Sequence, residues 1–187
     1  MHARPTLVAD QLAVARTSSP TTSHIRVALA LWMLTGALTI LGVLLGHTWP
    51  ALAPGGTAHP TLHGTVGEAA SIFTHNARIL AAPMILTAAR WGRGPVTRAL
   101  GDAIVAATLL INPLLVGSAL GRHGAGLLVY LPHLPLEWAA LSITSAAWVT
   151  SRHSNTRART LAAYAAMALL LTATTALVET FTTPHAA

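Results

Sequence analysis

Several kinds of residue are missing or scarce in this chain, and each absence narrows what the protein can be. Cysteine is absent, which excludes disulfides, thiolate nucleophiles and cysteine-ligated metal sites. Lysine is also absent, so all eleven basic residues are arginine. Only 9% of the residues are charged, whereas about a quarter are charged in an ordinary soluble domain. Together with 53% hydrophobic residues, this composition indicates a polytopic membrane protein.

Apolar runs long enough to cross a bilayer recur along the chain. A helix of about 20 apolar residues spans the hydrocarbon core. Runs near that length occupy five stretches, at 26–48, 67–89, 97–120, 126–150 and 158–179. Short segments rich in glycine, proline or polar residues separate them. The sequence therefore predicts an all-α, polytopic transmembrane helical bundle of about five spans. We expect one transmembrane domain over residues 25–183, preceded by a mobile polar tail at 1–24.

The arginines predict how the chain is oriented. Nine of them precede the first span or lie between the second and third or the fourth and fifth spans: Arg4, Arg16, Arg26, Arg90, Arg93, Arg98, Arg152, Arg157 and Arg159. Only Arg122 lies in a segment on the opposite side. Because arginine-rich loops stay in the cytoplasm, we predict a multi-pass protein of the cell membrane with a cytoplasmic N-terminus. The arginines flank apolar runs, so membrane lipid is the expected partner and nucleic acid is not.

Ionisable and amide side chains occur inside the predicted spans, where they are costly and mark functional sites by default. They are distributed over the second, third and fourth spans: Glu68, His75, Asn76, Arg78, Asp102, Asn112, His133 and Glu137. At 1.5 Å per residue, His75, Asn112 and His133 lie about 10–12 Å below the outer ends of their spans. Polar groups from three helices therefore share one depth, which predicts a common cavity in the outer half of the membrane.

The segment YLPHLPLEWAA is unusual for a membrane span. Pro132 and Pro135 fit a helix that starts at about residue 134, after a non-helical approach. A break of this kind is tolerated in a membrane only where it is buried or lines a wet cavity. His133 and Glu137 are four residues apart, so they share one face of an intact helix. We therefore predict a broken helix near 132–135 that presents both side chains to the cavity.

Some of these signals have structural alternatives. His133 and Glu137 are also consistent with a buried ion pair that locks two helices together. Arg78 either binds a substrate, neutralises Glu137, or extends along the helix toward the membrane surface. GVLLG and GSALG match the small-xxx-small pattern of helix packing, although glycine is common in membrane helices.

Three motifs lie in the second to fourth predicted spans: FTHNARI, LLINPLLVGSALG and LPHLPLEWAALSITSAAW. In order and spacing, they resemble the stage II sporulation protein M family of integral membrane proteins, over roughly residues 65–150. The positions that match the family's pattern are His75, Asn76, Asn112, Gly117, Gly121, Pro132, His133 and Glu137. Pro113 and Leu134 stand where that family has glycine.

The resemblance implies a helical membrane protein that works in a heteromeric complex. Some members of the family accompany the export, immunity or maturation of ribosomally made peptides, and the membrane subunit of linaridin-type peptide maturation is a similar case. The expected partners are therefore a peptide substrate and a second protein subunit.

For a peptide-modifying subunit, the polar residues suggest acid/base chemistry. His75 and His133 would be the catalytic acid/base pair, and Glu137 would orient or tune His133. Three further polar side chains are expected to bind the peptide: Asn76, Arg78 and Asn112. The chain has no nucleotide-binding motif and no cysteine. Proton transfer at a peptide Cα, without a cofactor, is thus the most economical reaction, and its result is epimerisation.

Two other assignments stay open. Zinc bound by His75, His133 and Glu137 would match a known catalytic ligand set, but there is no HExxH motif, and we expect no metal. Alternatively, the protein is a non-enzymatic permease or immunity subunit of a peptide export complex. The polar residues would then line a translocation path, and another chain would supply the energy.

Overall fold

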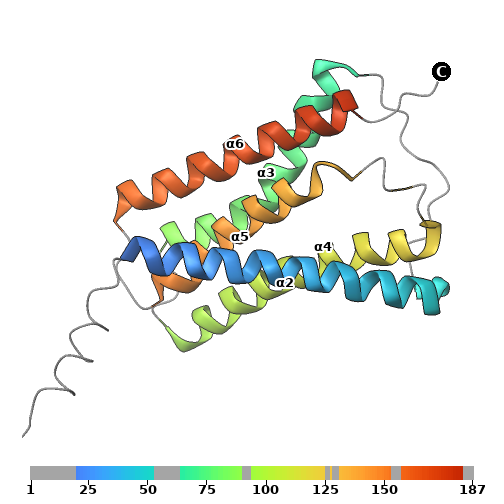
Figure 1. Cartoon of the computed structure of the whole chain (residues 1–187). Helices are drawn as coiled ribbons and strands as arrows, with labels where there is room; N and C mark the ends of the chain where they lie inside the picture. The colour runs from blue at the N-terminus through green and yellow to red at the C-terminus, as the bar shows by residue number, and fades with distance from the viewer. Residues whose placement is uncertain are drawn as a thin grey trace, which may run out of the picture.

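The computed structural model describes residues 20–52, 64–89, 94–124, 127, 131–152 and 157–182. Within these residues the chain forms six helical elements: α2 (Pro20–Thr48), the short 3₁₀ helix η1 (Pro50–Leu52), α3 (Val66–Ala88), α4 (Pro95–His123), α5 (Leu134–Ser151) and α6 (Ala158–Thr182). Consecutive long helices run in opposite directions (Figure 1). The prediction of an all-α helical bundle is confirmed.

α5 is the centre of the bundle. It contacts α2 on one side and both α3 and α6 on the other, while α2 and α4 pack against each other along most of their lengths (Figure 1). Many buried side chains of α5 are small, among them Ala140, Ser142, Ser145, Ala146 and Ala147. Small side chains let membrane helices approach closely, which explains why α5 can contact all four other long helices.

In the described part of the chain, three helical segments are long and apolar enough to cross a membrane: Thr22–Thr48, Pro95–His123 and Ala158–Thr182. Their outward faces carry large apolar side chains, including Leu29, Met33, Ile40, Leu44, Ile111, Leu170 and Leu177. Such a surface is compatible with lipid and unfavourable in water. The protein is therefore a membrane protein with transmembrane helices.

α2 and α4 meet at a glycine seam, formed by Gly42, Gly46, Gly117 and Gly121. A Cβ atom on Gly117 would overlap the carbonyl oxygen of Thr39, and one on Gly46 would overlap that of Ser118. The two backbones are thus in direct contact, and any larger residue would separate them. The two small-xxx-small patterns in the sequence mark this contact.

The helix boundaries agree with the sequence where proline sets them. α5 begins at Leu134, with Pro135 in its first turn, and residues 131–133 precede it in a non-helical conformation. The predicted helix start at about residue 134 is therefore confirmed, whereas residues 128–130 before it lie outside the described residues. Of the two side chains predicted to face the cavity, Glu137 lines it and His133 does not. α2 is described from Pro20, inside the region predicted as a tail. The rest of that tail lies outside the described residues, as do Arg90 and Arg93.

A polar contact fixes α4 against α5 at the end of the bundle opposite the α5 N-terminus. The indole Nε1 of Trp148 donates a hydrogen bond of 3.0 Å to Asp102 Oδ1. Arg152 Nη1 lies 2.8 Å from the same carboxylate oxygen. A Cβ on Gly101 would overlap the Trp148 ring, so this glycine makes room for the indole.

Candidate functional site

A polar cavity of about 180 Å³ lies among α3, α4, α5 and α6. Its polar lining comes from all four helices: His75, Asn76, Asn112, Glu137 and Thr172. Apolar side chains such as Leu80, Val116 and Trp138 complete the wall. Of the residues predicted to share this cavity, His75, Asn112 and Glu137 line it, whereas His133 is not part of its lining.

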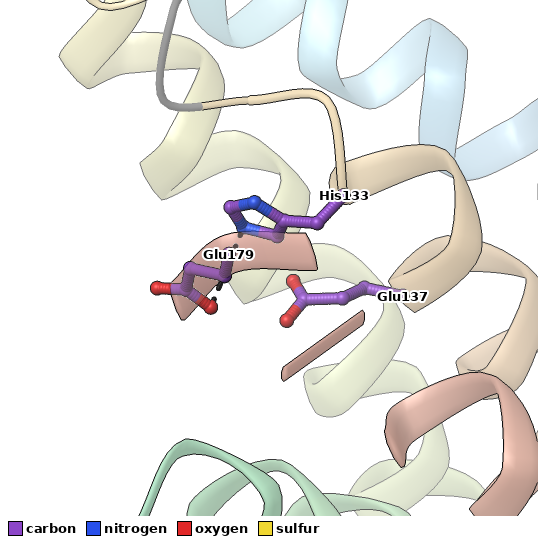
Figure 2. A group of neighbouring side chains, drawn as sticks. All are labelled: His133, Glu137 and Glu179. Atoms are coloured by element: carbon purple, nitrogen blue, oxygen red, sulfur yellow. Dashed lines mark ion pairs between the residues drawn. The ribbon is translucent and has the colours of Figure 1, made fainter. Parts of the chain in front are cut away.

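Beside the cavity is a group that we call the His133 cluster, formed by His133, Glu137 and Glu179. One ligand-type atom from each residue lies within 4.8 Å of the others, and the three side chains converge in Figure 2. His133 Nε2 lies 3.7 Å from Glu179 Oε2. The carboxylate nearest to His133 is therefore that of Glu179, and not that of Glu137, which we had expected to orient the imidazole.

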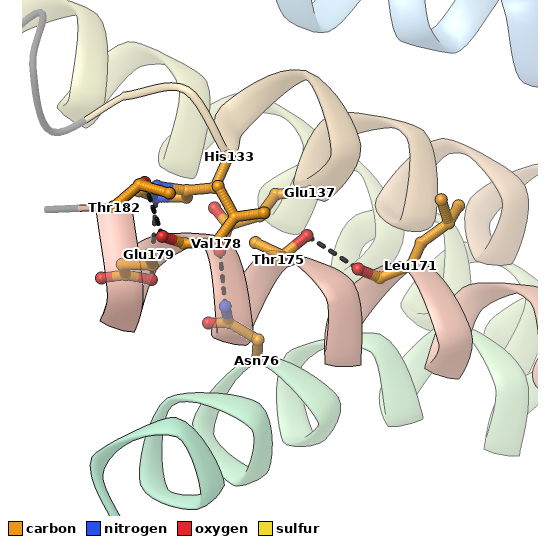
Figure 3. A network of polar contacts seen from close by, with 8 residues as sticks. All are labelled: Asn76, His133, Glu137, Leu171, Thr175, Val178, Glu179 and Thr182. Atoms are coloured by element: carbon orange, nitrogen blue, oxygen red, sulfur yellow. Dashed lines mark hydrogen bonds and ion pairs between the residues drawn. The ribbon is translucent and has the colours of Figure 1, made fainter. Parts of the chain in front are cut away.

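Asn76 and Glu137 form the polar contact between α3 and α5. The side-chain amide of Asn76 donates a hydrogen bond to Glu137 Oε1 (Figure 3). This bond holds the Glu137 carboxylate at the boundary between the cavity and the His133 cluster. Asn76 therefore positions a carboxylate in this structure, and its expected role in binding a peptide stays a prediction.

Of three further residues predicted to belong to the site, two line the cavity and one does not. His75 lines the cavity and lies close enough to Glu179 for an electrostatic interaction. Asn112 also lines the cavity, and its amide makes a long hydrogen bond of 3.4 Å to the Thr108 carbonyl oxygen on its own helix. Arg78 is exposed on α3 and is not part of the cavity wall. The structure therefore does not bring Arg78 to the site.

Local features of the sequence set the depth of these side chains. Thr65 caps the start of α3, where its hydroxyl accepts from the Glu68 backbone N–H and the Glu68 carboxylate accepts from the Thr65 backbone N–H. Glu68 is thus a capping residue. Glu137 lies in the first turn of α5, where the positive end of the helix dipole stabilises a carboxylate. The start of α5 therefore places the Glu137 side chain at the cavity.

Glu179 is the site residue that the sequence analysis missed. It lies inside the last apolar run, so its charge alone was a signal. The predicted span ends at residue 179, which would leave the carboxylate at the membrane surface. α6 continues to Thr182, and its last turn brings Glu179 beside His133.

No protein family, curated protein or solved structure matches the chain. Its function is therefore inferred from the polar cavity and the residues around it.

Proposed function

We propose that the protein is the integral membrane subunit of a peptide-modifying complex, as the resemblance to the stage II sporulation protein M family implies. Its task in that complex is proton transfer in the polar cavity. The observation that carries this proposal is a cavity lined by His75 and Glu137, beside which Glu137 also lies close to His133 and Glu179. Histidine is the side chain best suited to accept and return protons near neutral pH.

Epimerisation at a peptide Cα is the reaction that fits these groups. One imidazole would accept the Cα proton, and the other, already protonated, would deliver a proton to the opposite face of the same carbon. The peptide then leaves with the same composition and inverted chirality, and the two imidazoles have exchanged protonation states. Glu179, as the ion-pair partner of His133, would stabilise the imidazolium form.

Amide side chains support the developing charge. Loss of the Cα proton places negative charge on the neighbouring carbonyl oxygen of the peptide, and preorganised N–H donors stabilise such an oxyanion. Asn112 lines the cavity and offers a side-chain amide for this purpose. Asn76 already donates to Glu137, so it supports the carboxylate and adds a polar surface for the peptide.

In the membrane, we propose five spans with a cytoplasmic N-terminus, supported by the arginine distribution and the alternating helix directions in Figure 1. The cavity then lies in the outer half of the bilayer, and a peptide reaches it from within the membrane or from outside. Arg78 is exposed near the middle of α3, where an arginine facing lipid is costly. It is therefore our candidate contact for the second protein subunit or for the peptide.

The experiment is solvent deuterium incorporation at the peptide Cα, measured by mass spectrometry with the purified complex in D₂O. Wild type should incorporate deuterium, and His75→Ala and His133→Ala should not, although both variants still bind the partner subunit. His133→Gln should fail as badly as His133→Ala, because glutamine forms hydrogen bonds but does not carry protons near neutral pH.

His123→Ala is the matched control, since His123 is exposed at the end of α4, outside the cavity lining, and its loss should leave incorporation unchanged. If the wild-type complex incorporates no deuterium into a peptide that it binds, the epimerase proposal is wrong. A non-enzymatic permease or immunity subunit of a peptide export complex would then take its place.

A further inference from the structure

We infer that the His133 cluster binds a divalent transition-metal cation, with Zn²⁺ as the expected ion. One ligand-type atom from each of His133, Glu137 and Glu179 lies within 4.8 Å of the other two (Figure 2). Ligands of a tetrahedral zinc ion are about 2.0–2.2 Å from the metal, which places them about 3.3–3.5 Å from one another. The Nε2–Oε2 separation of 3.7 Å between His133 and Glu179 is close to that spacing and too long for a hydrogen bond.

The imidazole of His133 gives a second observation in favour of a metal site. His133 is only 7% exposed, and within the described part of the chain its ring makes no hydrogen bond. Nδ1 is buried without a partner, while Nε2 points toward Glu179 (Figure 2). A cation bound between Nε2 and the carboxylates would give this nitrogen a direct ligand bond in place of the long contact with Glu179.

The charges of the cluster favour a cation. Glu137 and Glu179 bring two carboxylates close together at half-buried positions. Two histidines face these carboxylates: His133 pairs with Glu179, and His75 lies close enough to Glu179 for an electrostatic interaction. Carboxylates buried in apolar surroundings are costly unless they are paired or bind a metal. A divalent cation would neutralise both and would leave the imidazole neutral, as a metal ligand must be.

The ligand atoms of the His133 cluster determine which kind of metal ion fits. One imidazole nitrogen with carboxylate oxygens suits Zn²⁺ and related transition metals, whereas Mg²⁺ and Ca²⁺ prefer oxygen ligands alone. Asn76 hydrogen-bonds to Glu137, and such bonds commonly hold a metal-binding carboxylate in place. Glu137 also lines the polar cavity, so the fourth position of the ion can face that cavity and bind water.

This inference goes beyond the proposed function and differs from the sequence-based expectation of no metal, which was made without Glu179. Zinc binding can be measured without a peptide or partner subunit, so it does not depend on the proposed reaction. With zinc bound, His133 Nε2 no longer accepts protons. Water on the ion, which zinc makes acidic, would then be the second proton carrier. His75 would keep the role proposed for it.

The test is equilibrium dialysis of the purified, metal-stripped chain in detergent against ZnCl₂, with bound zinc quantified by mass spectrometry. We expect one tightly bound zinc per chain, retained in excess Mg²⁺ or Ca²⁺. Glu179→Gln should weaken binding by roughly 100-fold or more, since loss of a supporting residue alone costs about 10–100-fold. Glu68→Gln is the matched control, because Glu68 caps α3, and it should bind zinc like wild type.

X-ray absorption of zinc bound to the wild-type chain gives a readout that does not depend on how well a variant folds. One imidazole together with oxygen ligands supports the inference. Zinc held by several imidazoles indicates adventitious binding to surface histidines such as His47 and His123, and it overturns the inference. Unchanged affinity in Glu179→Gln overturns it as well. Zinc binding without deuterium exchange would refute only the proposed function, and exchange without zinc would refute only this inference.

Discussion

The side-chain amide of Asn76 on α3 donates a hydrogen bond to the carboxylate of Glu137 on α5, 61 positions away in the chain. It is a direct polar link between α3 and the central helix of the bundle (Figure 3). The sequence predicts that Glu137 orients His133. In the structure, Glu137 is held by Asn76, and His133 is paired with Glu179.

Asn76→Ala should destabilise the bundle by about 0.5–2 kcal/mol, because it removes an interhelical hydrogen bond to a half-buried carboxylate. Asn76→Asp should be worse, since a second carboxylate would face Glu137. Thermal unfolding in detergent, followed by tryptophan fluorescence, measures both. Thr74→Ala is the control, because Thr74 bonds only to Ala70 on its own helix. Equal stability of the Asn76→Ala and Thr74→Ala variants would contradict this prediction.

Gly117→Ala should disrupt the glycine seam. The added methyl group would overlap the carbonyl oxygen of Thr39, so the backbones of α2 and α4 must separate, at a cost of about 1–3 kcal/mol. Gly36→Ala is a matched control on α2, since a Cβ there meets nothing within 4 Å and alanine is the better helix former. The unfolding temperature should fall in the first variant and stay the same or rise in the second. A fall of similar size in both would show that the seam is not tightly packed.

The contact of Asp102 with Trp148 and Arg152 predicts a graded series. Asp102→Ala should cost about 1–3 kcal/mol, because the indole N–H loses its acceptor. Asp102→Asn retains an acceptor oxygen and loses only the ion pair with Arg152, so it should cost less. The difference between wild type and Asp102→Asn should shrink at high salt, since both charged groups are partly exposed. Chemical denaturation at two salt concentrations checks the order, and equal losses would refute it.

Membrane orientation can be tested with single cysteines, because the natural chain has none. Thr48→Cys at the end of α2 and Ala158→Cys at the start of α6 introduce thiols at exposed positions. In intact cells an impermeant maleimide should label the first, and it should label the second only after the membrane is opened. The natural chain, which has no cysteine, should not be labelled and is the negative control. Reversed labelling would place the polar cavity in the inner half of the membrane.

The sequence predicted the fold well because its strongest signals are properties of single helices. Apolar length defines a span, and Pro132 and Pro135 define where α5 begins whatever surrounds them. GVLLG and GSALG indicated that backbones can approach, but not which helices meet. That α2 pairs with α4, and not with α3, depends on the fit of all five helices and cannot be read from one of them.

The candidate site was predicted only in part. The sequence indicates how deep a residue lies along its span better than which face of the helix it occupies. Counting residues along each span was enough to bring His75, Asn112 and Glu137 to one cavity. Arg78 was expected at the site because it is an ionisable residue in the same span, but the sequence does not say which face of α3 is covered. Counting residues excluded Glu179, because an error of a few residues in a helix end decides whether a charge is inside the bundle.

The order of contacts along the chain constrains how the protein is assembled during synthesis. α3 packs mainly against α5 and α6, which are both made after it, whereas α2 and α4 can pair as soon as α4 emerges. Until the ribosome has released α6, the histidine and amide groups of α3 lack most of their protein neighbours. We therefore expect α3 to depend on the insertion machinery during that interval. A nascent chain that stops after α4 therefore leaves a polar helix without its partners, and membrane quality control should recognise and degrade it.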